Sequence, residues 1–240
     1  MTSKKKQTQT LNKSDFYDLR FTEKQKLFQE TIRDSTITIC QGSAGSSKTF
    51  TSCYTALKLL SENQVNKIIL IKNCSEVGNS MGHLPGTIEE KMNVHFLPYI
   101  DNINQIIPKQ TTGFLLSSDE IILQPAQFVR GLSFRKAVIL VDESQNLTIE
   151  ELMAIITRIG EGSKLIICGD VSQHDIATRL VALPTIGKLL DGISHEEHKV
   201  SFFEFTPQDV VRHPLLIKIT ETYEQWKYSE DGKKSGLFKK

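Results

Sequence analysis

Five short runs of apolar, mostly β-branched residues recur along this chain, and each is apolar without interruption rather than in alternation. These candidate strands are Thr36–Cys40, Lys67–Lys72, Ala137–Val141, Lys164–Cys168 and Val200–Phe205. Strands of this kind are covered on both faces, which is the usual condition in a parallel sheet. Helical patterns lie between them, at Lys48–Glu62, Thr87–Asn93 and Ile149–Ile159. The alternation predicts an α/β fold, with a mainly parallel sheet and helices on both faces.

One stretch interrupts this alternation of strands and helices. Thr112–Leu116 and Glu120–Leu123 are joined by residues 117–119, which read Ser-Ser-Asp and resemble a turn. Two short apolar runs with such a connection are typical of a β-hairpin. We therefore expect a small hairpin inserted before the third core strand.

The two ends of the chain differ in composition from its body. Residues 1–13 are polar and rich in lysine, and we expect them to form a disordered basic tail. Residues 230–240 predict a second flexible basic tail for the same reason. Residues 14–229 are long enough for a single α/β domain with its own core.

Composition limits the partners and the cellular location that we expect for such a domain. The net charge is +1, so a polyanion would have to bind at a local patch rather than through a global field. The four cysteines form no CxxC pair, which indicates reduced, buried thiols; they are Cys40, Cys53, Cys74 and Cys168. No apolar stretch has the length of a signal peptide or a membrane span, so we expect a cytoplasmic protein with no membrane partner.

A loop of small residues follows the first candidate strand and precedes a helical pattern. Residues 42–49 read Gly-Ser-Ala-Gly-Ser-Ser-Lys-Thr. Small residues let successive backbone N–H groups turn inward around phosphates, and the following helix directs its positive N-terminus at them. The candidate nucleotide-binding residues are Gly42, Ser43, Ala44, Gly45, Ser46, Ser47, Lys48, Thr49 and Phe50.

Two side chains of this loop have distinct expected roles. Lys48 would reach the β- and γ-phosphates, and the Thr49 hydroxyl would ligate Mg²⁺. The usual pattern has glycine directly before the lysine, whereas this chain has Ser47. If that position needs a dihedral that serine disfavours, nucleotide binding is weakened by about 1–3 kcal/mol. The alternative is a surface turn that caps a helix, with Ser46 as its N-cap.

Polar residues also follow two further candidate strands. Ala137–Val141 leads into Asp142 and Glu143, where the first carboxylate can hold Mg²⁺ and the second can position and deprotonate water. Lys164–Cys168 is followed closely by Gln173, which can sense the γ-phosphate. Taken singly, these are a charged strand end and a turn. Because three parallel strands end in one crevice, the combination predicts ATP hydrolysis.

Beyond these motifs, the chain resembles the PhoH family, whose members are similar to the first motor domain of superfamily-one helicases. Three further stretches carry the resemblance, Gly82–Lys91, Phe128–Phe134 and Asp209–Pro214. The resemblance extends over Phe21–Tyr223 and implies a RecA-like P-loop fold that uses ATP and Mg²⁺. It also implies that Gln25 reads adenine, since a glutamine amide can donate to and accept from the base edge.

This chain departs from the family pattern at several positions that bear on affinity and rate. Serines replace a proline and a glycine of the usual loop at Ser43 and Ser47, Lys72 stands where arginine is usual, and Ser144 where alanine is usual. Some family members carry a preceding nuclease domain. The 20 residues ahead of the matched stretch are too few for one, so we expect no nuclease activity.

The helicase resemblance also bears on partners. Those helicases place ATP between two motor domains, the second of which supplies an arginine, so a single domain implies an arginine from a neighbouring subunit. We expect a homo-oligomeric ring, for example a hexamer, with Arg212 as first candidate and Arg158 and Arg130 behind it. Helicases of this class contact single strands after the second core strand, so Asn73–Glu90 is the candidate contact with RNA or DNA. Its candidate phosphate ligands are Asn73, Ser75, Asn79 and His83.

Three functions remain open at this point. The first is an oligomeric, helicase-like ATPase that acts on single-stranded nucleic acid, with RNA the more expected. The second is a nucleotide-gated regulatory switch that remodels a protein partner. The third is a small-molecule kinase, against which Glu143 argues because a kinase needs no water-activating base there.

Overall fold

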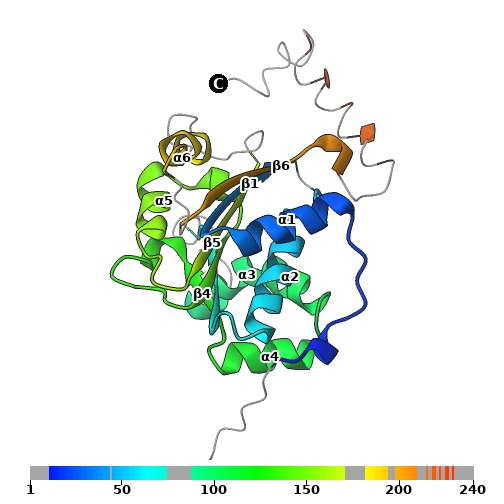
Figure 1. The fold of residues 1–240 in the computed structure, drawn as a ribbon, viewed down its shortest axis with the longest axis vertical. Coiled ribbons are helices and arrows are strands. Elements are labelled where there is room, and N and C mark those ends of the chain that lie inside the picture. The colour runs from blue at the N-terminus through cyan, green and yellow to red at the C-terminus, as the bar shows by residue number, and fades with distance from the viewer. Residues whose placement is uncertain are drawn as a thin grey trace, which may run out of the picture.

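A computed structural model describes residues 11–43, 45–74, 88–170, 182–193 and 198–209, together with seven separate residues between 215 and 229. For residues 88–93 it describes the backbone alone. Among these described residues, six strands form one sheet in the order β3-β2-β4-β5-β1-β6, and every pairing is parallel (Figure 1). The strands are β1 (Ile37–Gly42), β2 (Lys67–Lys72), β3 (Ile121–Pro125), β4 (Ala137–Val141), β5 (Lys164–Gly169) and β6 (Val200–Phe205).

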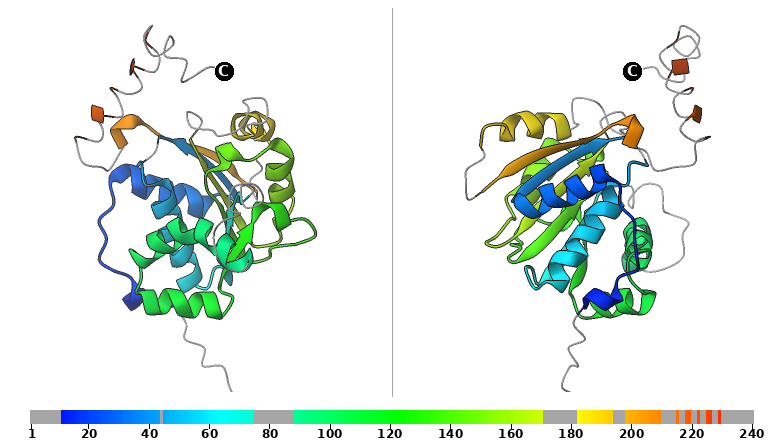
Figure 2. Two further views of the ribbon diagram at one scale, coloured as in Figure 1. Left: turned by 180° about the vertical axis from the view of Figure 1, so that it is seen from behind. Right: turned by 45° about the vertical axis from the view of Figure 1, so that its right-hand side comes forward.

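Helices cover both faces of this sheet. They are α1 (Glu23–Asp34), α2 (Lys48–Ser61), α3 (Ile88–Asn104), α4 (Lys109–Ser117), α5 (Ile149–Ile156) and α6 (Leu183–Leu190). Figures 1 and 2 show α1, α2 and α3 on one face and α5 and α6 on the other. Four short 3-10 helices complete the described elements, η1 (Lys13–Asp15), η3 (Ala126–Phe128), η4 (Ser144–Asn146) and η6 (Pro207–Asp209). The predicted α/β fold with helices on both faces is confirmed.

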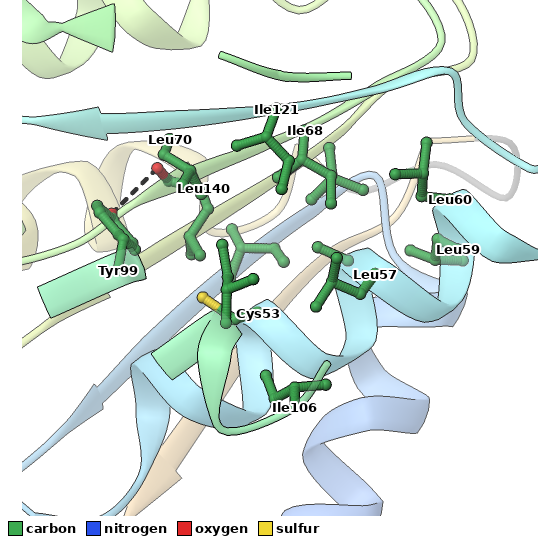
Figure 3. Close-up of a cluster of buried hydrophobic side chains, with 14 of the residues drawn as sticks. Cys53, Leu57, Leu59, Leu60, Ile68, Leu70, Tyr99, Ile106, Ile121 and Leu140 are labelled. Atoms are coloured by element: carbon green, nitrogen blue, oxygen red, sulfur yellow. Dashed lines mark hydrogen bonds between the residues drawn. The ribbon is translucent and has the colours of Figure 1, made fainter. Parts of the chain in front are cut away.

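The strands bury their side chains alternately on the two faces, as continuously apolar strands should. In β4, Val138 and Leu140 pack in the core beneath α1, α2 and α3, whereas Ile139 and Val141 pack in the core beneath α5 and α6. Figure 3 shows part of the first core, in which leucines of α2 such as Leu57 meet β2 and β4. All five predicted strands are present, with ends that differ by at most two residues.

The strand order determines which loops can meet. The chain passes from β1 over β5 and β4 to reach β2, so β5 lies between β1 and β4 in the sheet. Because all strands are parallel, the carboxyl ends of β1, β5 and β4 are neighbours at one edge of the sheet. Ligands of open α/β sheets bind in the crevice outside such strand ends. These are the three ends at which the sequence predicted phosphate, magnesium and γ-phosphate contacts.

The predicted hairpin is wrong. Residues 109–117 form α4, and β3 pairs in parallel with β2 as an edge strand of the sheet. Thr112 and Leu115, three residues apart, are both buried, which is helical rather than strand spacing. The turn between them and β3 is left-handed at Asp119, with φ of 61°. A short apolar run fits either period, and here the helical one matches the buried positions.

Other boundaries also differ from expectation. The pattern at Thr87–Asn93 is the start of the much longer α3, which continues through Pro98. Helix α5 ends at Ile156, three residues before its expected end. Residues 1–10 and 230–240 lie outside the described residues. Residues 11–13, which we expected to be disordered, belong to the folded domain, because Leu11 is 2% exposed in the core and Lys13 begins η1.

Two expectations from composition can be compared with the fold. All four cysteines are buried and none of them forms a disulfide, as expected. Cys40 and Cys168 are direct neighbours on β1 and β5, and burial raises the pKa of the Cys40 thiol well above its ordinary value. Across the part of the chain that is described, no helix combines the length and the apolar character needed to cross a membrane.

Tyr99 of α3 offers a test of how the helical layer is attached to the sheet. Its buried hydroxyl donates to the carbonyl oxygen of Ile71, near the end of β2, at 3.0 Å. It also donates to that of Leu140, near the end of β4, at 3.3 Å (Figure 3). Tyr99→Phe removes this donor, and we expect it to lower the free energy of unfolding by about 1 kcal/mol in denaturant titrations. Tyr17→Phe, at a side chain that is 48% exposed, is the control and should change stability little. Equal losses in both variants would contradict this attachment.

Candidate nucleotide-binding site

The loop after β1 is built by close approach and by left-handed backbone. Gly42 ends β1 beside β6, where an added Cβ would lie 2.8 Å from the Cβ and the carbonyl oxygen of Phe205. Gly45 and Ser47 both have positive φ, 89° and 62°. Ser47 therefore adopts the dihedral that glycine usually serves, at a cost of roughly 1–2 kcal/mol. Helix α2 nevertheless begins directly after Ser47, at Lys48, so the missing glycine does not prevent the turn into the helix.

Lys48 begins α2 and folds back over this loop. Its Nζ donates to the carbonyl oxygens of Gly42 (2.6 Å) and Ser43 (3.0 Å), and the residue is 9% exposed. Ser46 is fully buried, and its hydroxyl donates to the same Ser43 carbonyl at 2.9 Å. An ammonium held inside a loop at a helix N-terminus is suited to phosphate oxygens, which would add to the partners it already has.

Thr49 and Asp142 meet across the site. The Thr49 hydroxyl donates to Oδ2 of Asp142 at 2.9 Å, although the two residues are 93 positions apart. Asp142 is 7% exposed, and burial, together with the nearby Glu143 carboxylate, raises its pKa above the ordinary value. A buried carboxylate lacking full compensation, next to a hydroxyl, forms a donor set of the kind that Mg²⁺ binds through oxygen. These two side chains therefore fit a Mg²⁺ ion shared with bound phosphates.

No group of three or more His, Cys, Asp or Glu side chains gathers into a metal cluster in the described ranges.

A cleft of about 590 Å³ opens over these residues and contains most of the predicted site. Its lining residues are Arg20, Thr22, Gln25, Gly45, Ser47, Lys48, Thr49, Phe50, Asn102, Gln105, Asp142, Glu143, Gly169 and Asp170. The volume is within the range of small-molecule sites. The loop after β1, the acidic pair after β4 and the end of β5 are thus brought together.

Six lining residues of this cleft were not predicted as site residues: Arg20, Thr22, Asn102, Gln105, Gly169 and Asp170. Asn102 and Gln105 lie near the C-terminal end of α3, well past the point at which the sequence pattern suggested that the helix stops. Arg20 is exposed and precedes α1. Asn102 and Gln105 could have been predicted only from the full length of α3 and its packing against α2.

Gln25, the expected adenine reader, lines the cleft, and so does Phe50. It is 6% exposed and forms a capping box at the start of α1: its Oε1 accepts from the backbone N–H of Thr22 (2.9 Å), and its own N–H donates to the Thr22 hydroxyl (3.2 Å). Its amide group is therefore oriented before any ligand binds, with Oε1 directed at the backbone.

Several predicted residues cannot be placed. The residues that lie outside the described part of the chain are Ala44, Ser75, Asn79, His83, Gln173 and Arg212.

Other predicted residues are described but lie elsewhere or have other partners. Arg130 and Arg158 do not line the cleft. Arg158 donates to the Leu132 carbonyl oxygen at 3.2 Å, away from the nucleotide loop. Lys72 lies near enough to lower the pKa of Asp142, against the effect of burial. Asn73 donates to the Asn146 carbonyl oxygen at 2.7 Å.

Glycine substitutions at the adjacent residues Ser46 and Ser47 should change the free energy of unfolding in opposite directions. Ser47→Gly should raise the free energy of unfolding by roughly 0.5–1 kcal/mol, because release of left-handed strain exceeds the extra entropy that glycine loses on folding. Ser46→Gly should lower it, because Ser46 has no positive φ and loses its buried hydrogen bond to Ser43. Denaturant titration of both variants measures the difference. A loss of stability in Ser47→Gly would contradict the strain at that position.

Comparison with solved structures gives only distant similarity. The Pif1 helicase from Candida albicans aligns over 79% of this chain and 40% of its own, with a TM-score of 0.39 and 14% identity. A structure described as two coordinating Pif1 helicases at forked double-stranded DNA aligns over 89% of this chain and 50% of its own, with a TM-score of 0.40 and 14% identity. Similarity at this level supports no conclusion about function.

Sequence comparison is more informative. A PhoH-like protein of Synechocystis sp. is 33% identical over 208 residues, covering 85% of this chain and 61% of the relative. One from Bacillus subtilis is 35% identical over 185 residues, covering 77% and 57%, and protein PhoH of Escherichia coli is 27% identical over 205 residues, covering 84% and 56%. This chain therefore spans less than two thirds of their length. A family model described as PhoH-like protein matches residues 20–224, and the chain belongs to the PhoH-like family.

Proposed function

We propose that this chain is an ATPase that binds ATP with Mg²⁺ in the cleft and hydrolyses it. The observation that carries the proposal is the hydrogen bond from Thr49 to Asp142, because it joins the phosphate loop to the acidic strand end with Glu143 beside it. A phosphate loop alone serves many reactions. A loop that shares its cleft with a magnesium-type carboxylate and a second carboxylate has what phosphoryl transfer to water requires.

The phosphate end of the cleft supplies binding and charge stabilisation. The Lys48 ammonium would lie against the β- and γ-phosphates, and the N-terminus of α2 would add its positive dipole. Thr49 and Asp142 would hold Mg²⁺, which when bound neutralises negative charge on the phosphate oxygens. Gln25 would donate its amide N–H to the base edge, since its Oε1 is already engaged by Thr22.

Glu143 would supply the chemistry of water attack. Its side chain is exposed, lines the cleft and directly follows the magnesium-type carboxylate. It would orient the attacking water and accept its proton. We further propose that Gln173 senses the γ-phosphate and that Arg212 of a neighbouring subunit stabilises the charge that develops on it. Both residues lie outside the described residues, so these roles rest on the sequence.

The partners follow from the same proposal. An arginine supplied from outside the chain requires a homo-oligomer, and a head-to-tail ring such as a hexamer provides it at every site. Single-stranded nucleic acid, with RNA preferred, would bind near the segment that begins at Asn73, because β2 ends at the same edge of the sheet as the cleft. Binding there would change the geometry of the acidic turn through the Asn73 contact with Asn146.

The role of Glu143 is tested by Glu143→Gln, which keeps the shape of the side chain and removes the base. We expect ATP turnover to fall by at least about 100-fold, because general-base catalysis contributes roughly 10²–10⁴-fold. ATP affinity, measured by calorimetry, should remain within a few-fold of the original. Glu150→Gln makes the same change at an exposed position of α5 and should leave turnover intact. Retained turnover in Glu143→Gln would refute the assignment.

Coupling to nucleic acid is tested by measuring ATP turnover with and without single-stranded RNA or DNA. We expect stimulation that is lost as salt rises, since phosphate contacts release counterions on binding. Stimulation by RNA above that by DNA would support the preferred substrate. No stimulation by either polymer would contradict this part of the proposal and favour a nucleotide-gated switch acting on a protein partner.

A further inference from the structure

The turn that carries Glu143 is held firmly in its backbone. Glu143 itself is left-handed, with φ of 52°, and the following residues form η4. The N–H of Asn146 donates to the Glu143 carbonyl oxygen at 3.0 Å, and Asn73 at the end of β2 donates to the Asn146 carbonyl oxygen at 2.7 Å. A non-glycine residue in this region costs about 1–3 kcal/mol and persists only where its surroundings enforce it.

The backbone contacts leave the Glu143 side chain to be oriented by something else. An exposed glutamate has several rotatable bonds and would otherwise sample many rotamers. Gln145, two residues later, meets this need. Its Nε2 donates to Oε2 of Glu143, while its Oε1 accepts from the backbone N–H of Asp170 at 3.0 Å. Gln145 is 1% exposed, so these partners are reached inside the protein.

The direction of the Gln145 amide is unambiguous. The N–H of Asp170 can only donate, so it requires the amide oxygen, which leaves the amide NH₂ to donate to the Glu143 carboxylate. The two contacts thus select one amide orientation between them. A side chain with both ends engaged and almost no exposure is a rigid support for the carboxylate that it contacts.

Gly169 at the end of β5 makes room for this arrangement. An added Cβ there would lie 2.6 Å from the Ser144 Oγ and 3.0 Å from the Gln145 Oε1. The Cδ2 atom of Leu183 would also lie 2.6 Å away, so any larger residue would force Leu183 or η4 to shift. A shift of η4 would stretch the bond between Gln145 and Asp170. The hydrogen bond between Gln145 and Asp170 therefore needs η4 and the end of β5 to lie this close together.

We propose that Gln145 is the positioning residue for Glu143, holding Oε2 of that carboxylate so that its Oε1 meets the attacking water. The inference rests on the proposed ATPase activity and adds a residue to it. Through Asp170, Gln145 also connects the base to the end of β5, so the carboxylate and that strand end keep one mutual geometry. Loss of such positioning lowers the rate of the chemical step without weakening the binding of the substrate.

The test uses two variants at this position. Gln145→Glu is nearly isosteric, keeps an acceptor for the Asp170 N–H and replaces the donor facing Glu143 by a repelling carboxylate. Gln145→Met keeps the length and neutrality of the side chain and removes both contacts. We expect kcat for ATP to fall about 10- to 100-fold in each, with KM and calorimetric ATP affinity within about twofold of the original protein. Circular dichroism and thermal melting confirm that each variant is folded.

Gln64→Glu is a matched control. Gln64 also donates its amide to a glutamate two residues earlier, Glu62 at 3.0 Å, but it lies on an exposed turn after α2, outside the cleft. This change should leave kcat unaltered. A purely structural role predicts that Gln145→Glu, which keeps the Asp170 contact, hydrolyses ATP better than Gln145→Met.

The results distinguish a failure of the positioning role of Gln145 from a failure of the proposed ATPase activity. Unchanged or increased kcat in folded Gln145 variants, with active original protein, would overturn the positioning role alone. Parallel losses of ATP affinity and kcat would also overturn it, since they indicate a damaged site. Absence of ATP turnover in the original protein would overturn the proposed function, and the positioning role with it.

Discussion

The hydrogen bond between Thr49 and Asp142 reaches across a whole strand of the sheet. Thr49 lies in the first turn of α2, which follows β1, whereas Asp142 directly follows β4. Strand β5 lies between those two strands. Helix α2 must therefore lean closely over β5. Ser52 makes this possible by presenting a small side chain whose Oγ lies 3.5 Å from the Cys168 Sγ. Every proposed role at the phosphate end of the cleft depends on this approach, because it brings the loop and the carboxylates within reach of one ligand.

The same approach explains the electrostatics of the site. Asp142 is brought into a buried position beside Glu143, and burial raises its pKa, so the free protein holds a carboxylate whose charge is poorly compensated. Lys48 is engaged with loop carbonyl oxygens rather than with this carboxylate. A cation accompanied by phosphates would compensate both groups together, which gives the proposed ligand a physical basis beyond motif resemblance.

Sequence reasoning succeeded where one period or one motif dominates. The uninterrupted apolar runs gave five strands and both helical layers, and the polar residues after β1 and β4 do line one cleft. It failed at residues 109–117, where a short apolar run is compatible with strand and helix alike and tertiary packing decides. Asn102 and Gln105 were missed because their place in the cleft depends on the length and packing of α3. Gln145 was passed over because its meaning lies in two contacts, with Glu143 and the backbone of Asp170, that no local pattern records.

The central claim is that the ends of β1 and β4 form one site for ATP and Mg²⁺. Calorimetric ATP affinity, with Mg²⁺ and with a chelator in its place, tests this most directly when the original protein is compared with Thr49→Val. This variant keeps the branched shape and removes the hydroxyl bonded to Asp142. We expect Mg²⁺ to strengthen ATP binding to the original protein, and most of this gain to disappear in Thr49→Val. The affinity without Mg²⁺ should be similar in both proteins. An equal Mg²⁺-dependent gain in the two proteins would contradict the central claim.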